Sequence, residues 1–312
     1  MRPSLVRLTA LALTLLVCGC SLKRMAVNSV ANSIAAGGDV YSRDDDPDLI
    51  RDAVPFGLKT MESLLEVVPD NRNLLLAACQ GYTQYAYAFV QLDADTIESK
   101  NYDEATRLHD RALRLFLRGR NYGLRALELK HKGITHGLQA RPDSAARVLT
   151  AKEVPLVYWT AAAWGSAINL GKDRPDLAAD IDAVRALIHR GLALDEGYEH
   201  GAFHEAMIVM EALPPAMGGS PARAREHFEK AVALSQGARP GPYVTLAQSV
   251  SVASQDRREF RELLGKALAV DPEKYPSDRL QTILLQSKAR ALLAREEELF
   301  LDADTTSVEK SK

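Results

Sequence analysis

The segment that decides the fold is Pro69-Asp70-Asn71-Arg72-Asn73-Leu74-Leu75-Leu76-Ala77-Ala78-Cys79-Gln80-Gly81-Tyr82-Thr83-Gln84-Tyr85-Ala86-Tyr87-Ala88-Phe89-Val90-Gln91, residues 69–91. Its first three residues end one helix and cap the next, because Pro cannot continue a helix and Asp or Asn accepts free N–H groups at a helix start. The residues that follow are typical of a helix with apolar side chains on nearly every side. Such a helix is normally enclosed by others. We therefore predict a central helix around which the remaining helices pack.

Aromatic residues are concentrated in this helix and in a second segment, Leu156 to Gly165, where they are interleaved with small residues. Two interpretations are open. Rings at helical spacing are a normal feature of a packed core, but tyrosines, with an apolar ring and a polar tip, also suit the wall of a ligand-binding cavity or channel. For the second interpretation, the predicted lining residues are Tyr82, Tyr85, Tyr87, Phe89, Tyr158, Trp159 and Trp164.

The N-terminus is typical of an exported lipoprotein. A short basic region containing Arg2 and Arg7 precedes an apolar run from Leu8 to Cys18, which is too short to span a bilayer stably. Val17-Cys18-Gly19-Cys20 resembles a bacterial lipobox, in which cleavage precedes the cysteine and a diacylglyceryl group is attached to it. We predict a signal peptide at 1–19, a segment at 20–43 lipidated on Cys20, a helical domain at 44–301 and a disordered tail at 302–312.

Removal of the signal peptide changes both the cysteine count and the charge. Cys79 becomes the only unmodified cysteine, so no intramolecular disulfide is expected, and its apolar surroundings predict a buried hydrophobe rather than a reactive thiol. The chain has 39 Lys and Arg and 41 Asp and Glu; loss of Arg2 and Arg7 leaves a formal balance of −4. This balance argues against a nucleic-acid partner. Contact with a membrane is therefore expected through the lipid.

The fold class is predicted as all-α. No region alternates with period two for long enough to form a sheet, and Pro and Gly fall between helical segments. A small or apolar residue, a large apolar residue four positions later and a small residue three positions after that recur along the chain, loosely in some places. This pattern resembles the second helix of a tetratricopeptide repeat. We predict an α-solenoid of degenerate tetratricopeptide-like hairpins around the central helix. The pattern occurs at Gly57/Met61/Leu64, Ala105/His109/Ala112, Val184/Ile188/Gly191, Ala224/Phe228/Ala231 and Phe260/Leu264/Ala267.

Two polar features of the sequence are candidate sites. Glu196, His200 and His204 recur every four residues, and a helix from Tyr198 to Glu211 would place the histidines on one face, where they could hold zinc. Packing histidines are the alternative, and we favour it because Gly197 and Gly201 weaken the helical geometry. The arginines between Asp103 and Lys132 are expected to form a solvated or partner-facing stripe, or less plausibly a phosphate site. No nucleophile elbow, phosphate-binding loop or CxxC motif is present, so we expect no enzymatic activity, no cofactor and no metal.

Many segments, taken in order, resemble the T-component lipoproteins associated with TRAP transporters. The resemblance spans about residues 25 to 301 and is weakest near Leu138 to Arg147. It is carried by Asp44-Asp45-Asp46-Pro47, Pro55-Phe56, Met61 to Leu65, Pro69-Asp70-Asn71, Gly81 to Gln91, Trp159 to Gly165, Leu192 to Glu196, Gly218-Gly219-Ser220, Arg223 to Phe228, Gln255-Asp256 and Leu299-Phe300.

This resemblance implies a lipid-anchored periplasmic protein of tetratricopeptide-like repeats that assembles as a trimer. It also implies a pore through each protomer and contact with the solute-binding protein of a tripartite ATP-independent periplasmic (TRAP) transporter. We therefore expect an accessory protein that docks this solute-binding protein and shelters or conducts a small apolar ligand. The alternative is a repeat adaptor in envelope assembly that binds no ligand. Ser21 follows the lipid cysteine where an inner-membrane retention signal would have Asp, which favours the outer membrane.

Overall fold

The computed structural model describes residues 23–301, and within this range every regular element is helical. The all-α prediction is therefore confirmed. The predicted signal peptide, the lipidation site Cys20 and the tail at 302–312 lie outside the described residues.

The elements in chain order are a helix at 23–35, η1 (Ala36–Gly38), α2 (Asp39–Ser42), α3 (Pro47–Val67), α4 (Arg72–Ala86), η2 (Tyr87–Gln91), α5 (Leu92–Ile97), α6 (Tyr102–Glu128), α7 (Ile134–Ala140), α8 (Pro142–Ala146), η3 (Ala151–Glu153), α9 (Val154–Leu170), α10 (Pro175–Ala178), α11 (Ile181–Leu194), η4 (Tyr198–His200), α12 (Ala202–Glu211), η5 (Pro215–Met217), α13 (Pro221–Leu234), α14 (Gly241–Leu246), η6 (Ala247–Ser251), α15 (Arg257–Leu268), η7 (Pro276–Asp278), α16 (Arg279–Ala294) and α17 (Glu296–Leu299).

Short polar side chains begin the long helices, as their sequences predict. Asp46 accepts hydrogen bonds from the N–H groups of Asp48 and Leu49, at 3.1 and 3.0 Å, with Pro47 in the first helical position of α3. Asn71 accepts from Leu74 N at 2.8 Å and so starts α4. These caps satisfy N–H groups that have no partner inside the helix.

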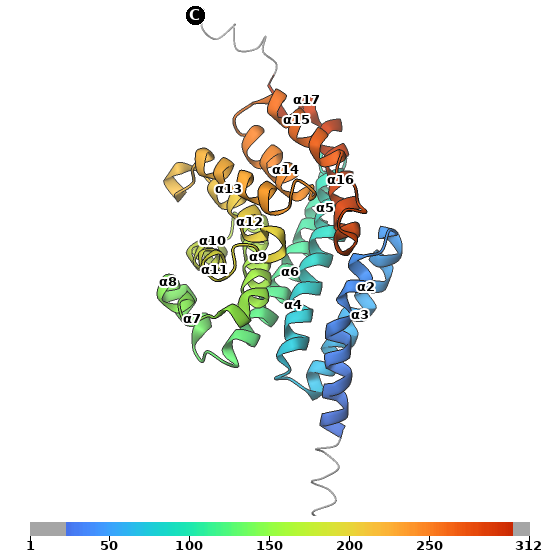
Figure 1. Cartoon of the computed structure of the whole chain (residues 1–312), viewed down its shortest axis with the longest axis vertical. Coiled ribbons are helices and arrows are strands. Elements are labelled where there is room, and N and C mark those ends of the chain that lie inside the picture. The colour runs from blue at the N-terminus through green and yellow to red at the C-terminus, as the bar shows by residue number, and fades with distance from the viewer. Residues whose placement is uncertain (1–22, 302–312) are drawn as a thin grey trace, which may run out of the picture.

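The molecule is organised around α4, α6 and α9, with α6 packed between the other two (Figure 1). Glycines let the three helices come close. A Cβ on Gly123 of α6 would lie 2.2 Å from Thr160 Oγ1 on α9 and 3.0 Å from Cys79 Sγ on α4. A Cβ on Gly119 would lie 2.8 Å from Thr83 Oγ1. The apolar segment quoted first is thus one of three interior helices.

Gly123→Ala is expected to lower the free energy of unfolding by about 1–3 kcal/mol, because the added methyl group overlaps Thr160 and Cys79 in a closely packed site. Gly265→Ala on α15 is the matched control, since a Cβ there meets no atom within 4 Å. The control should be neutral or stabilising by about 0.5–1 kcal/mol, as Ala favours a helix more than Gly. Chemical denaturation of both variants measures the difference. Equal stabilities would contradict the close approach of the three helices.

The buried apolar side chains of the described residues form two hydrophobic cores. The first is formed mainly by α3, α4, α6, α9 and α11, with Leu74, Phe116, Trp164 and Leu187 fully buried. The second is formed by α14, α15 and α16 with parts of α12 and α13, around Phe260 and Leu264. Neighbouring helices pack in pairs, among them α12 with α13 and α15 with α16. The tetratricopeptide-like geometry of these pairs stays a prediction.

A helix near the C-terminal end of the chain packs against helices near its N-terminal end. Helix α16 packs against α2, α3 and α5 (Figure 1). Arg279 Nη1 donates to the carbonyl of Arg43 at 3.2 Å, and Arg295 Nη1 donates to the carbonyl of Asp95 at 2.8 Å. Because of this return, the region between the two cores is bordered by helices from both ends of the chain.

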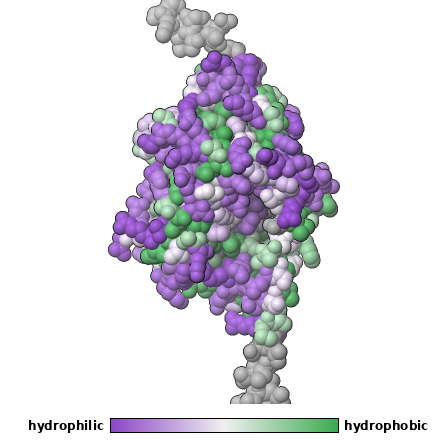
Figure 2. All heavy atoms as spheres, viewed as in Figure 1, coloured by the Kyte–Doolittle hydropathy of each residue, from purple (hydrophilic) through white to green (hydrophobic). Residues whose placement is uncertain are grey.

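One face of the molecule is mainly polar. Hydrophilic residues cover most of the face seen in Figure 2, and apolar residues occur there in small separated areas. Within residues 23–301, no helix combines the length and the apolar composition that crossing a membrane requires.

Candidate functional site

The seven aromatic residues predicted to line a cavity lie in three places. Tyr82, Tyr85 and Phe89 are 2%, 8% and 5% exposed and lie beneath arginine side chains. The guanidinium groups of Arg118, Arg111 and Arg51 lie 5.3, 5.8 and 5.1 Å from the respective ring centroids. These distances suit cation–π contact. These rings therefore lie directly under the arginine side chains of a basic surface.

Trp164 occupies a second place, in the first core. Its indole N–H donates to Asp180 Oδ2 at 3.1 Å, and the Arg120 guanidinium lies 5.4 Å from its ring centroid. The side chain is fully buried. It fills the space between α9 and the start of α11.

Tyr87, Tyr158 and Trp159 lie in the third place; all three are half-buried, and Tyr87 and Tyr158 pack against the first core. The Tyr158 ring contacts those of Trp159, Tyr198 and Phe203, with centroids 5.0, 5.4 and 5.4 Å apart. Tyr87 begins η2, and its hydroxyl accepts a hydrogen bond from Lys288 Nζ at 3.2 Å. The fold thus brings residue 87 together with residue 288.

Lys288 on α16 and Glu205 on α12 add opposite charges to this place. Thr245 Oγ1 donates to Glu205 Oε1 at 3.3 Å, and a Cβ on Gly241 would lie 2.5 Å from both carboxylate oxygens. Among residues 23–301, neither Lys288 nor Glu205 has an ion-pair partner within 4 Å. We call Tyr87, Tyr158, Glu205, Thr245 and Lys288 the polar interior.

The pKa values show how deeply these groups are enclosed. Burial raises the pKa of Glu205, and the nearby charges of Arg239 and Lys288 only partly oppose this. Burial also acts to lower the pKa of Lys288, but Tyr87, Asp95 and Glu205 together outweigh it and raise that pKa. The pKa of Tyr158 is raised by burial and then by Glu205. Nevertheless Tyr87, Tyr158, Glu205 and Lys288 keep some accessible surface. These side chains are therefore enclosed but not wholly excluded from solvent.

Arg239 borders the polar interior but is fully engaged. Its Nε lies 3.1 Å from Asp278 Oδ2, its Nη2 donates to Gln281 Oε1 at 2.8 Å, and its Nη1 donates to the Glu199 carbonyl. A guanidinium held on three sides keeps its position. Arg239 therefore joins α16 and η7 to the η4 turn, whereas the contacts of the Lys288 ammonium are to Tyr87, through its hydroxyl and its ring.

Two π-helical turns flank the polar interior. Tyr87 is the first residue of η2, and η6 begins two residues after Thr245. A π turn inserts a residue into an α-helix and is found frequently at functional sites, where it redirects a side chain. The η2 turn packs into the first core through Phe89 and Val90, and η6 packs into the second through Ala247 and Val250. Each turn thus lies at or next to one residue of the polar interior, Tyr87 or Thr245.

The helix expected from Tyr198 to Glu211 begins only at Ala202, so the structure does not form the helical zinc arrangement, which was the less favoured interpretation. Helix α12 begins at Ala202, and Glu199, His200 and Gly201 all have positive φ, so Glu196, His200 and His204 do not share a continuous helical face. His200 stacks on Tyr275 with centroids 4.5 Å apart. His204 Nε2 lies 2.9 Å from Glu196 Oε1, and its Nδ1 lies 2.7 Å from His227 Nδ1. Among the described residues, no group of His, Cys, Asp and Glu forms a metal-binding cluster.

Cys79 lies at the meeting of α4, α6 and α9 and is fully buried. Burial raises the pKa of its thiol to about 12, which Thr160 and Gly123 only partly oppose. The thiolate is the reactive form of cysteine. Cys79 is therefore a packing residue, as its sequence context predicts.

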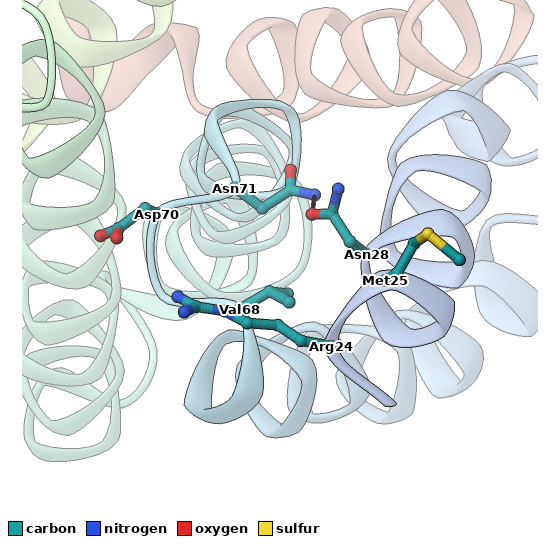
Figure 3. A pocket seen from close by; sticks show the side chains of 6 residues that line it. All are labelled: Arg24, Met25, Asn28, Val68, Asp70 and Asn71. Carbon is teal, nitrogen blue, oxygen red and sulfur yellow. Dashed lines mark hydrogen bonds between the residues drawn. The ribbon is translucent and has the colours of Figure 1, made fainter. Parts of the chain in front are cut away.

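A pocket of about 340 Å³ lies where the helix at 23–35 meets the turn between α3 and α4 (Figure 3). Asn71 Nδ2 donates to Asn28 Oδ1 at 2.7 Å and to Asn32 Oδ1 at 3.0 Å, and the Arg24 side chain extends past Val68. Amide hydrogen bonds thus attach the N-terminal helix to the turn. Because residues that line the pocket make these bonds, we assign it to helix attachment.

The sequence analysis missed Lys288 and Glu205, although one signal was present. Leu285, Lys288 and Leu292 occupy one apolar stripe of α16, so the lysine stands where the pattern requires a hydrophobic residue. A lysine at such a position is seldom fully buried unless a partner compensates its charge. This departure pointed to an interior polar group, but its neighbours could only be known from the fold.

Comparison with known proteins agrees with this architecture. Residues 43–300 match the family model described as the TRAP transporter T-component. The chain is also 30% identical to an uncharacterised protein of Treponema pallidum (strain Nichols), over 94% of this chain and 97% of that protein. The family match thus identifies the class of protein as a TRAP transporter accessory component. This chain belongs to the TRAP transporter T-component family.

Proposed function

We propose that this T-component is a lipid-anchored periplasmic protein that docks the solute-binding protein of a TRAP transporter and shelters a small ligand in the polar interior. The family assignment supports association with a TRAP system. The proposed anchor is the lipid on Cys20, in the outer membrane rather than the inner, and the proposed assembly is a trimer. Neither a catalytic role nor a metal is part of the proposal.

The observation that carries ligand sheltering is the enclosed ammonium of Lys288, whose nearest polar partner is the neutral hydroxyl of Tyr87 at 3.2 Å. An enclosed charge is costly unless it is paired or solvated. The carboxylate of Glu205, also in the polar interior, accepts a side-chain hydrogen bond from one described residue, the hydroxyl of Thr245. Both groups would gain from a polar ligand group or from water held in the interior.

The surroundings also define the kind of ligand that fits. The rings of Tyr158, Tyr198 and Phe203 offer apolar surface beside Lys288 and Glu205. The apolar ligand expected from the rings alone is therefore refined to an amphipathic one. Its apolar body would lie against the aromatic rings, and its polar end would reach Lys288 or Glu205.

Lys288→Met tests this site with 1-anilinonaphthalene-8-sulfonate, a probe that combines aromatic rings with one anionic group. The variant is expected to bind the probe about 10-fold more weakly, because a hydrogen bond to a charged group contributes about 1.5–3 kcal/mol. Fluorescence titration of the full-length protein measures the dissociation constant. The matched control is Lys266→Met, which removes the same charge from an exposed position on α15.

Tyr158→Ala provides a second measurement, since it removes apolar surface while leaving Lys288 in place. A lowered affinity for the probe in both Lys288→Met and Tyr158→Ala, with wild-type affinity in Lys266→Met, supports the proposal. No difference among the four proteins would contradict ligand sheltering in the polar interior. That result would favour the alternative function, an envelope adaptor without a ligand.

A further inference from the structure

Helix α6 presents a line of arginines on one face. Arg111, Arg114, Arg118 and Arg125 follow each other at spacings of three, four and seven residues, which places them along one side of a helix. Part of this line borders a groove of about 400 Å³. The residues that line the groove are Arg114, Leu117, Arg118, Asn121, Tyr122 and Arg125. We call this face the arginine groove.

The aromatic residues of α4 form the support for this face. Arg118 and Arg111 lie over the rings of Tyr82 and Tyr85, and Arg111 Nη2 also donates to the Tyr85 hydroxyl at 3.4 Å. Guanidinium planes stacked on rings have fewer accessible orientations than free side chains. Arg111 and Arg118 are thus held in place before any partner binds.

Positive charge exceeds negative charge in the groove. Glu62 of α3 lies 3.1 Å from Arg118 Nε, accepts a hydrogen bond from the Tyr122 hydroxyl at 2.8 Å, and is shared with Lys59. Within residues 23–301, Arg114 and Arg125 have no carboxylate within 4 Å; Arg125 Nη2 donates to the Pro69 carbonyl at 2.6 Å. Arg114 is exposed. In a chain with more acidic than basic residues, this local excess stands out.

We propose that the arginine groove docks an acidic segment of the solute-binding protein. This inference rests on the proposed function, because the solute-binding protein is the partner named there. Arginine forks bind carboxylates through two parallel hydrogen bonds, which gives both affinity and orientation. Two guanidinium groups without carboxylate partners are available for such contacts, while Leu117 offers apolar surface between them.

The shape of the groove favours a protein segment over a small anion or a membrane. The stripe from Arg111 to Arg125 is about 21 Å long, given a rise of about 1.5 Å per residue, and a small anion would contact only a fraction of it. Helix α6 runs along the long axis of the molecule, with the N-terminal helix at one end (Figure 1). A membrane at that end would meet only one end of the stripe.

The test measures binding of the full-length protein to the purified solute-binding protein of the same transporter by calorimetry at 50, 150 and 300 mM NaCl. The variant is Arg114→Glu with Arg125→Glu, at two positions that contact no described side-chain carboxylate. The matched control is Arg258→Glu with Lys266→Glu, which makes the same change of charge at exposed positions on α15. Thermal melts verify that both variants are folded.

The groove variant is expected to bind at least 10-fold more weakly at 150 mM NaCl and to show a smaller dependence on salt, whereas the control binds as the wild type does. Equal binding by all three proteins would overturn the inference while leaving docking itself intact. Failure of the wild type to bind the solute-binding protein would overturn both the inference and the docking function, while the probe titration would still report on ligand sheltering. Binding to vesicles with 30% phosphatidylglycerol that the groove variant alone loses, with unchanged binding to the solute-binding protein, would assign the groove to a membrane.

Discussion

Trp164→Ala is expected to lower the free energy of unfolding by about 3–5 kcal/mol, the range typical of removing a large buried aromatic side chain. Trp164 has no exposed surface and lies in the first core between α9, α6 and the start of α11. Truncation removes the dispersion contacts of the ring and leaves a cavity that rigid helices fill only partly. It also leaves Asp180, which is 8% exposed, without the indole N–H. Urea denaturation followed by circular dichroism measures the change.

Trp164→Phe separates packing from hydrogen bonding. This variant keeps a ring beneath Arg120 but loses the N–H donor to Asp180, which still accepts from Gln139 Nε2 at 3.2 Å. The expected loss is about 1–3 kcal/mol, the cost of a buried acceptor that loses one partner. It remains measurable even where Trp164→Ala does not fold. A loss in Trp164→Ala no larger than that in Trp164→Phe would contradict the packing role of the ring.

Acid is expected to weaken the fold through Glu153, which is 1% exposed at the start of α9. Its Oε1 lies 2.7 Å from His131 Nε2 and 3.1 Å from Lys130 Nζ, and its Oε2 accepts from the N–H and hydroxyl of Thr150 at 2.9 Å each. Burial alone would raise the pKa of Glu153, but the Thr150 backbone, His131 and Lys130 outweigh burial and lower the pKa from 4.5 to about 2.

The direction of the pH effect follows from this lowered pKa. The folded state stabilises the ionised carboxylate of Glu153 more than the unfolded state does. Its contribution to the free energy of unfolding is therefore complete above pH 4.5 and is lost as the pH falls toward 2. The contribution is about 3 kcal/mol, given about 1.4 kcal/mol per pKa unit. Glu153→Gln is therefore expected to destabilise the protein at pH 6 by at least this amount, since Lys130 and Arg72 then lose their shared carboxylate.

The measurement is the free energy of unfolding at several pH values between 6 and 2. The wild type should lose stability more steeply below pH 4.5 than Glu153→Gln. Glu66→Gln is the control, because Glu66 is exposed on α3 and makes no ion pair in the described part of the chain. A Glu153→Gln variant with the wild-type acid profile would show that this carboxylate does not govern acid stability.

Local features of the sequence predicted much of the secondary structure. Asp46 and Asn71 identify helix starts because their side chains satisfy N–H groups three residues away or less, and such contacts depend only on nearby residues. The η4 turn shows where local reasoning failed. Glu199 and His200 adopt positive φ, which side chains with a Cβ seldom do, so no propensity would have predicted it. Arg239, 40 residues away, holds the turn by its hydrogen bond to the Glu199 carbonyl.

The candidate site could not be predicted from the sequence, for a different reason. The aromatic segments were visible in the sequence, but their rings serve three surroundings: Tyr82 and Tyr85 lie under arginines, Trp164 is in a core, and Tyr158 faces the polar interior. Hydrophobic periodicity reports that a side chain is turned inward, but it does not report what lies opposite. The partners come from distant helices, as with Tyr87 and Lys288, which are 201 residues apart.

The sequence by itself determined that this protein is all-helical, where its long helices begin, and that it belongs with the TRAP transporter T-components. The reason is that helix caps, hydrophobic periodicity and family motifs each depend on short runs of neighbouring residues. The tertiary structure alone decided which helices meet. The return of α16 to α2, α3 and α5 places Lys288 beside Tyr87 and opposite Glu205. Electrostatic and packing interactions act over a few ångströms of space, whatever the separation along the chain, so the site exists only once the chain has folded.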